Sequence, residues 1–148
     1  MKISTKGIYA IEMMTDLAIH SVDRVESIKN IAGRRNLSEK YLEQIVSALK
    51  KAHLIESTRG ASGGYRLAKA PSEIRIYDIL DATERNLIPL ECLQKKIECG
   101  INCEKCATRG MWEEMWHQMK EVMDDVTLEQ IVQESKRNEK EDSIEYYI

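Results

Sequence analysis

All four cysteines of the chain lie within fifteen residues, at Cys92, Cys99, Cys103 and Cys106. Six, three and two residues separate successive sulfurs, and Gly100 adds backbone freedom between them. A flexible loop of this kind can bring four thiolates to one point, as a zinc ion or an iron–sulfur cluster requires. Only Cys103 and Cys106 have the C-x-x-C spacing that zinc prefers. The spacing therefore favours a zinc site and an iron–sulfur cluster about equally, with metal-free redox thiols as a third alternative.

No second site is evident among the other reactive residues. His20, His53 and His117 are scattered without ligand spacing, so we expect structural or surface roles for them. The sequence has no phosphate-binding glycine loop, no nucleophile elbow and no credible pair of catalytic carboxylates. We therefore expect a protein that is not an enzyme and has no small-molecule substrate.

Composition and charge favour a cytoplasmic protein with two unlike halves. A chain of 148 residues with 43% hydrophobic and 32% charged residues suits one soluble domain, with or without an appended helix. Residues 1–83 contain 13 Lys and Arg against 10 Asp and Glu, whereas residues 84–148 contain 9 against 15. Only the first half therefore suits phosphates. We find neither a signal peptide nor a membrane span, and reduced cytoplasmic thiols favour metal or redox chemistry.

The first fifty residues predict three capped helices. A buried stripe of Leu42, Ile45, Val46 and Leu49 marks the third helix. Two short helices joined by a tight turn form a helix-turn-helix, whose second helix reads the major groove. The expected helices span about 5–21, 28–35 and 39–51, with caps at Ser4 or Thr5, Ser27 and Ser38, and with Asn36 ending the second helix.

A two-stranded hairpin is predicted directly after these helices. Residues 54–59 and 65–68 read as strands, and the glycine-rich turn 60–64 supplies positive φ angles. A hairpin in this position is the wing of a winged helix. A short amphipathic helix over 76–83 and a linker over 85–90 follow. The fold class we predict is mainly α: a winged helix-turn-helix with a two-stranded β wing and a long C-terminal dimerisation helix.

Polar side chains at the start of the third predicted helix are candidates for DNA contacts. Ser38, Lys40, Tyr41 and Gln44 would face base edges and phosphates there. Arg59 stands at the start of the hairpin turn, where a guanidinium can enter a minor groove. The alternative is that these are ordinary solvated positions.

An apolar seam follows the cysteines. Trp112, Met115, Met119, Val122 and Val126 recur at alternating steps of three and four, which is a heptad pattern held for about two heptads. A stripe this apolar suits either burial within the chain or a homodimer. A last short helix is expected from Leu128 to about Ser135. We thus predict a DNA-binding domain at 1–84, a linker and cysteine loop at 85–110, the dimerisation and short C-terminal helices at 111–135, and a mobile tail at 136–148.

Three stretches resemble the signatures of one bacterial regulator family. They are MKISTKGIYA at residues 1–10, LSEKYLEQ at 37–44 and RGASGGYRL at 59–67. The resemblance is to the winged-helix family that contains IscR, NsrR and CymR, and it runs to about Asp125. It implies a dimer in which a long helix crosses to the partner. It places Ser38, Lys40, Tyr41, Glu43 and Gln44 on the recognition helix, and Arg59, Gly60, Ser62, Gly63 and Gly64 in the DNA-contacting wing.

The same resemblance implies a cluster site with one irregularity. Cluster-binding members carry three cysteines before the long helix, and Cys92, Cys99 and Cys106 match them. IscR-like members supply a histidine three residues later, but that position is Arg109 here, which cannot ligate iron. Cys103 is an extra thiol and our candidate for the fourth ligand. Ile8 replaces an arginine frequent in relatives, so one phosphate contact is missing.

The hypothesis is a homodimeric repressor that binds a double-stranded operator and senses iron–sulfur, redox or nitric-oxide status. Four thiolates suit both cluster types, and analogy with IscR favours [2Fe-2S] over [4Fe-4S]. Some members of the family bind no cluster, so a cluster-free thiol sensor of cysteine or sulfur metabolism is one alternative. The others are a zinc-stapled module and an electron-carrying iron–sulfur protein, neither of which would read DNA.

Overall fold

The computed structural model describes residues 2–95 and 99–145, which form six α helices and one two-stranded sheet. Helices α1 (Thr5–His20), α2 (Ile28–Arg35) and α3 (Glu39–Lys51) come first, followed by strands β1 (Ile55–Thr58) and β2 (Gly64–Leu67). The short helix η1 (Pro71–Glu73) and α4 (Ile76–Thr83) complete this part of the chain. The predicted winged helix-turn-helix is therefore confirmed; β1 is one residue shorter at each end than predicted, and β2 keeps its predicted length but begins one residue earlier.

Serine caps set the starts of the first three helices, as predicted. Ser4, Ser27 and Ser38 each accept a hydrogen bond from the backbone N–H three residues ahead. Asn36 ends α2 with φ of 53°, a left-handed conformation that asparagine tolerates. These local signals fix the tight turn between α2 and α3.

The wing is an antiparallel pair that is tied to the rest of the domain. Ile55 pairs with Leu67, and Thr58 pairs with Gly64 at the turn end. Tyr65 also exchanges two backbone hydrogen bonds with Glu26, each 2.8 Å long. The segment before α2 thus acts as a third, one-residue strand that holds the hairpin in place.

One hydrophobic core joins the helices of the winged domain. Apolar side chains of α1, α3 and α4 are fully buried in it, among them Met13, Leu49 and Ile79. Leu128, from the far end of the chain, is also fully buried in this core. Residues on both sides of the cysteine loop therefore build the same core.

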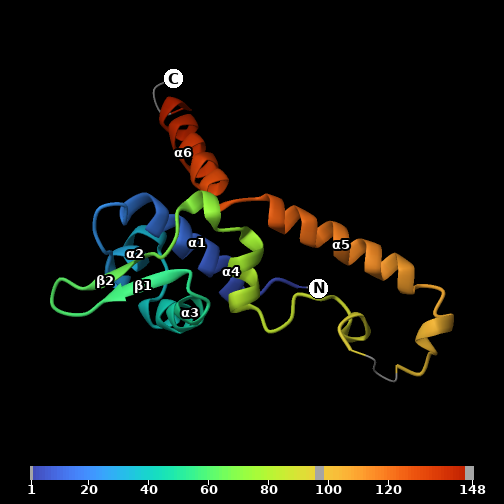
Figure 1. The fold of residues 1–148 in the computed structure, drawn as a ribbon. Helices are drawn as coiled ribbons and strands as arrows, with labels where there is room; N and C mark the ends of the chain where they lie inside the picture. The colour runs from blue at the N-terminus through green and yellow to red at the C-terminus, as the bar shows by residue number, and fades with distance from the viewer. Residues whose placement is uncertain (1, 96–98, 146–148) are drawn as a thin grey trace.

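The cysteine loop and α5 extend away from this domain. Short helices η2 (Glu91–Leu93) and η3 (Cys103–Lys105) lie in the loop, and α5 spans Arg109–Asp125. Figure 1 shows α5, in orange, leading from the loop back to the winged domain, where α6 (Leu128–Glu145) begins. No residue of α5 is fully buried.

Helix α6 is longer than the sequence suggested. We predicted an end near Ser135, but the helix continues to Glu145. Residues 136–145 contain no glycine or proline and are rich in Glu and Lys, which favour helix even without a buried face. The predicted mobility of 136–148 stays a prediction, and residues 146–148 lie outside the described part of the chain.

Candidate DNA-binding surface and cysteine loop

The start of α3 presents polar side chains because its opposite face is buried. Leu42, Ile45, Val46 and Leu49 pack into the core, which turns Ser38, Lys40, Glu43 and Gln44 toward solvent. Tyr41 is different, because it is half-buried and packs edge-to-face on Tyr9 with 5.5 Å between ring centroids. The exposed side chains form a surface of the size and polarity that a recognition helix needs.

The tip of the wing is exposed, whereas its last two glycines are packed. Arg59, Gly60 and Ser62 are open to solvent, and Gly60 has φ of 114°, which requires glycine. Gly63 and Gly64 are half-buried. A Cβ on Gly64 would lie 2.5 Å from the carbonyl oxygen of Glu26, so this glycine permits the close pairing of Tyr65 with Glu26. Its predicted contact with DNA stays a prediction.

An open groove of about 470 Å³ connects the wing to the helix-turn-helix. It is lined by wing residues including Arg59, by Ser27 at the start of α2 and by Lys50 near the end of α3. Ser27 and Lys50 were absent from the predicted DNA-binding residues. Only the packing of the wing against α2 and α3 brings them to the groove, so no local motif could identify them.

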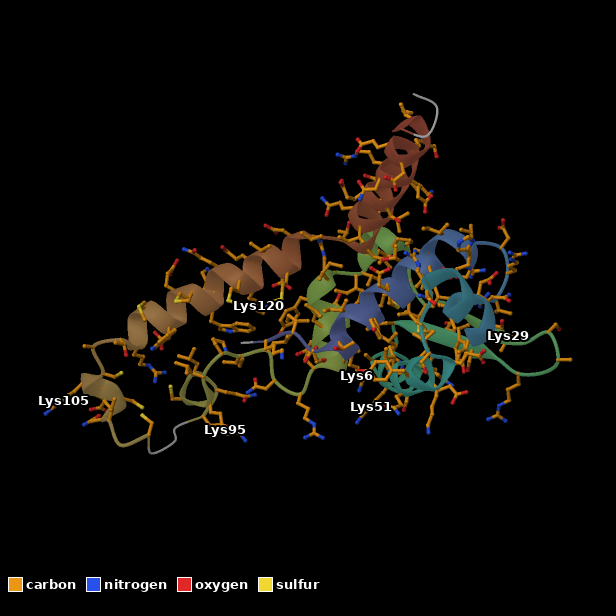
Figure 2. The ribbon with its side chains drawn as sticks, turned by 180° about the vertical axis from the view of Figure 1, so that it is seen from behind. Lys6, Lys29, Lys51, Lys95, Lys105 and Lys120 are labelled. Carbon is orange, nitrogen blue, oxygen red and sulfur yellow. The ribbon has the colours of Figure 1, made fainter. Side chains whose placement is uncertain are left out.

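Basic side chains occur both on the winged domain and on the segment that follows it. Figure 2 shows Lys29 and Lys51 on the winged domain, on the side that carries α3 and the wing. It also shows Lys95 and Lys105 on the cysteine loop and Lys120 on α5. Of the basic side chains in residues 1–83, Lys50 and Arg59 line the wing groove, where positive charge attracts a phosphate backbone.

A buried ionic cluster holds α1, α2 and the wing support together. Arg34 donates to Asp16 at 2.7 and 3.0 Å and to Glu26 at 2.8 Å. The two carboxylates are only 1% and 2% exposed. Burial alone would raise the pKa of Glu26, but hydrogen bonds and charge from Arg34 lower it overall. Hydrogen bonding to Asp16 in turn raises the pKa of Arg34. Glu26 is therefore ionised, and its backbone is fixed where it pairs with the wing.

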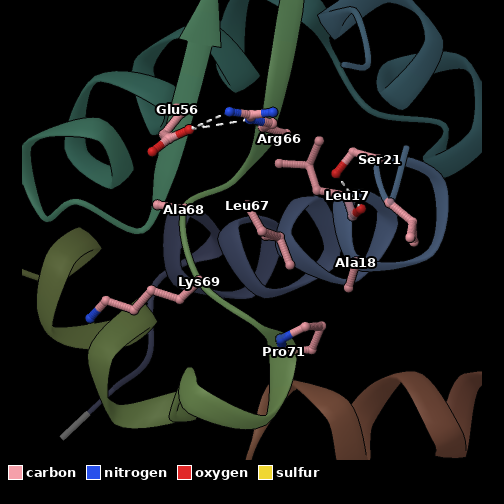
Figure 3. Close-up of a pocket in the computed structure, with 10 residues that line it drawn as sticks. Leu17, Ala18, Ser21, Glu56, Arg66, Leu67, Ala68, Lys69 and Pro71 are labelled. Atoms are coloured by element: carbon pink, nitrogen blue, oxygen red, sulfur yellow. Dashed lines mark hydrogen bonds and ion pairs between the residues drawn. The ribbon is translucent and has the colours of Figure 1, made fainter. Parts of the chain in front are cut away.

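A different hollow, of about 430 Å³, lies at the base of the wing (Figure 3). Leu17 and Ala18 of α1 meet Leu67 and Pro71 there, and the exposed Glu56–Arg66 pair, at 3.0 Å, stands at one side. Its charged groups are already paired or point along the surface. Of its two basic residues, Arg66 is paired with Glu56, whereas Lys50 and Arg59 of the wing groove form no ion pair among the described residues.

All four cysteines line a single hollow of about 180 Å³ at the start of α5. Its other walls are mainly apolar and come from Leu90, Leu93, Ile101 and Trp112. Cys99 is exposed, and the other three cysteines are half-buried. The structure therefore gathers the predicted thiols into one place, although they come from both limbs of the loop.

The local surroundings of the thiols differ. Cys106 Sγ lies 3.5 Å from Thr108 Oγ1, and this hydrogen bond, helped by the backbone N–H and charge of Arg109, lowers the pKa of Cys106. Cys99 Sγ contacts the carbonyl of Ile101 at 3.7 Å. A thiol with a lowered pKa is more often the thiolate, which is the form that binds metals and reacts.

Arg109 joins the two limbs of the loop. Its guanidinium donates to the carbonyl of Cys92 at 3.4 Å and pairs with Glu113 at 2.7 Å. The negative charge of Glu113, with smaller effects from Cys103 and Cys92, raises the pKa of Arg109. Arg109 thus lies on the wall of the cysteine hollow as a permanent cation and cannot itself ligate a metal.

The donor set fits a thiolate-ligated metal centre. Four soft sulfur donors around an apolar hollow match the chemistry of iron–sulfur clusters and of zinc. Among residues 2–95 and 99–145, no three His, Cys, Asp or Glu side chains converge closely enough to form a metal site. All four cysteines nevertheless line the same hollow.

The predicted seam of α5 divides between two faces. Met115 and Val122 are 47% and 65% exposed, and Met111 beside them is also open to solvent. Val126 instead packs against the core together with Trp116 and Met123. The exposed part of the seam is an apolar strip that no residue in 2–95 or 99–145 covers, as a dimer interface would leave on one protomer.

No helix in the described part of the chain combines the length and apolar character needed to cross a bilayer.

Comparison with known proteins identifies relatives along almost the whole chain. Residues 3–134 match the model of the Rrf2 family, described as an iron-dependent transcriptional regulator. The chain is 42% identical to the transcriptional regulator CymR of Bacillus subtilis over 88% of its own length and 89% of that protein. It is 31% identical to the regulator IscR of Vibrio atlanticus, covering 92% and 78%.

Solved structures agree with these sequence relatives. The structure of CymR, the global cysteine regulator of B. subtilis, superposes with a TM-score of 0.76 and 40% identity, covering 90% of this chain and 97% of that one. IscR of T. potens gives 0.72 and 36%, covering 91% and 88%. The oxidized form of Staphylococcus aureus CymR gives 0.68 and 36%, covering 89% and 96%.

Proposed function

The chain belongs to the Rrf2 family of transcriptional regulators, and on that premise we propose that it is a homodimeric repressor controlled by an iron–sulfur cluster on its four cysteines. The proposal has a DNA-reading half, residues 1–84, and a sensing half built from the cysteine loop and α5. The observation that carries it is the single hollow lined by Cys92, Cys99, Cys103 and Cys106.

In the reading half, the start of α3 enters the major groove and the wing follows the adjacent minor groove. Lys40, Glu43 and Gln44 are free to meet base edges or phosphates, since none of them packs into the core. Arg59 stands at the exposed wing tip, where a narrow minor groove attracts a guanidinium. A dimer presents two such readers to the half-sites of a pseudo-palindromic operator.

In the sensing half, the four thiolates hold the cluster and the chain around them changes shape. When bound, the cluster supplies sensitivity to oxidants and nitric oxide, and by analogy with IscR we favour [2Fe-2S]. Cys92, Cys99, Cys103 and Cys106 would together hold the cluster, which would join the two limbs of the loop. Arg109 keeps the two limbs together through Cys92 and adds positive charge beside the thiolates. The loop then holds the start of α5 in one position.

Anaerobic purification, an absorption spectrum and analysis of iron and sulfide test this proposal. We expect a coloured protein with iron and sulfide bound in wild type and in Arg109→His, and a large loss of both in Cys103→Ala. Full cluster content in Cys103→Ala would show that Cys103 is not the fourth ligand. A colourless protein with stoichiometric zinc would replace the cluster with a structural metal.

A cluster-free thiol sensor is the second candidate. Its support is the 42% identity to CymR, whose structure is described as that of a cysteine regulator, together with the exposed thiol of Cys99. Metal-free, reduced protein that binds operator tightly, and releases it when its thiols are oxidised, would favour this candidate. The cluster proposal instead expects metal-free protein to behave alike under mild oxidant and reductant until the cluster is rebuilt.

A further inference from the structure

The segment that carries the cysteine loop joins the winged domain at both ends of α4. Residues 85–126 leave after α4 ends at Thr83 and return beside residues 74–76, where α4 begins. Helix α4 also packs against α1 and α3. We infer that α4 transmits the state of the cysteine loop to α3, with Glu84 and the Lys120–Tyr77 pair as its positioning contacts. This inference rests on the proposed control of DNA binding by the loop.

The first attachment is at Glu84, the residue that ends α4. Its Oε1 accepts hydrogen bonds from the backbone N–H of Ser4 at 3.0 Å and from Ser4 Oγ at 2.7 Å. A negative charge at the start of α1 is stabilised by the helix dipole. Gly7 leaves the space for this carboxylate, since a Cβ there would clash with Glu84. The linker therefore leaves the domain from a point fixed on α1 and α4 together.

The second attachment is the elbow between α5 and α6. Ile76 N–H donates to Val126 and Leu128 N–H donates to Ile74, both at 2.9 Å, and the Leu128 side chain is fully buried. Nearly two turns before Val126 along α5, Lys120 Nζ lies 4.3 Å from the centroid of the Tyr77 ring. This cation–π contact links the outer face of α4 to the body of α5.

Movement of the loop must therefore act on α4. With its last residues fixed at the elbow, α5 behaves as a lever whose far end is held by the cysteines. Ile79 and Leu80 of α4 are buried in the core shared with α3, and a close-packed core passes a displacement on rather than absorbing it. A change in the angle of α5 shifts α4 and, through it, the tilt of α3.

Alkylation of the thiols provides a test that does not depend on which signal the loop senses. All four cysteines lie in the loop, so iodoacetamide modifies thiols there and nowhere else in the chain. The measured quantity is the ratio of DNA affinities of the anaerobically purified protein before and after any bound metal is stripped and the thiols are alkylated, on a duplex selected by wild-type protein from random-sequence DNA. Wild type should show a ratio of about 5–150, the usual range for coupled sites.

Removing the cation–π contact should reduce this ratio without abolishing DNA binding. We expect Lys120→Met and Tyr77→Leu to lower the affinity ratio by about 2- to 5-fold, because a partly exposed cation–π contact contributes only a small free energy. Tyr77→Phe keeps the ring and should keep the ratio. Lys140→Met, an exposed lysine on α6, is the matched control, and Glu84→Gln tests the first attachment in the same way. The DNA affinity of each variant before metal removal and alkylation serves as the check on folding.

The possible failures have different patterns. A wild-type ratio near 1 would refute control from the cysteine loop, and this inference with it. A wild-type ratio above 5 that persists unchanged in Lys120→Met, Tyr77→Leu and Glu84→Gln would refute only the role of α4. Equal losses in Tyr77→Phe and Tyr77→Leu would show that the ring–ammonium contact is not the link.

Discussion

Replacing Arg34 with methionine should destabilise the winged domain strongly, because it leaves two buried carboxylates without their shared cation. Asp16 and Glu26 are almost fully buried, and Arg34 contributes three hydrogen bonds to them at 2.7–3.0 Å. Removing one partner of a buried ion pair costs about 3–5 kcal/mol.

The expected loss is at the low end of that range or below it. Arg34 is itself 31% exposed, and each carboxylate keeps a weaker partner: Arg35 lies 3.4 Å from Asp16, and the exposed Arg24 lies 2.9 Å from Glu26. We therefore expect Arg34→Met to lower the free energy of unfolding by about 2–3 kcal/mol. For a chain of this length that is about 4–12 °C in the melting midpoint.

Arg137→Met is the matched control, since Arg137 pairs with Glu134 at 2.7 Å but both side chains are largely exposed. It should cost at most about 0.5 kcal/mol. Urea unfolding at one protein concentration measures both variants. A second change, Glu26→Gln, should restore part of the stability of Arg34→Met by removing one unpaired charge. A loss below about 1 kcal/mol for Arg34→Met, or a further loss in the double variant, would refute the argument.

The pH dependence of stability tests the same ionic cluster independently, through the direction in which the contribution of Glu26 changes with pH. The pKa of Glu26 is lowered from 4.5 in the fold, so its stabilisation is present above pH 4.5 and is lost as pH falls through the folded value. In Arg34→Met, burial dominates and should raise the pKa of Glu26. The contribution of Glu26 to stability should then increase, not decrease, as pH is lowered toward that raised value.

Three further predictions concern the wing, the seam and the last helix. Arg59→Ala should weaken operator binding and reduce the salt dependence by about one counterion, whereas Arg66→Ala, whose charge is paired on the strands, should not; equal effects in a titration at several salt concentrations would argue against minor-groove insertion. Met115→Lys should lower the molar mass measured by light scattering toward that of a monomer, while Gln118→Lys leaves it unchanged. A wild-type protein that is already monomeric would refute the assignment of the seam as a dimer interface. Amide exchange over 136–144 should be fast compared with the first turn of α6, because an isolated polar helix is marginal; strong protection there would instead indicate a partner.

Local signals in the sequence were sufficient for the winged domain. Serine caps, Asn36 and the buried stripe of α3 each act within a few residues, so their effects could be predicted without a fold. The end of α6 could not be predicted in this way. A polar segment rich in Glu and Lys is compatible with both a helix and a disordered tail, and only the absence of a breaker after Ser135 favoured the helix.

The candidate sites were only partly predictable for the same reason. The cysteine spacing identified the thiols, and the structure places them around one hollow. Nothing in the neighbourhood of Lys50 or Ser27 indicated the wing groove, and nothing near Glu84 indicated that it meets Ser4. Such contacts join residues up to 80 positions apart, and only the packed core determines them.

The burial of Leu128 has a consequence for the order in which the protein is made. The core of the DNA reader contains this residue, which follows the cysteine loop in the chain, so the ribosome synthesises every thiol before the reader can be completed. Domains fold as units once their last core residue has emerged. The four thiols are therefore exposed on the nascent chain at a stage when it has no finished surface for DNA. In the order of biosynthesis, the thiols that we propose as the sensor precede the completed DNA reader.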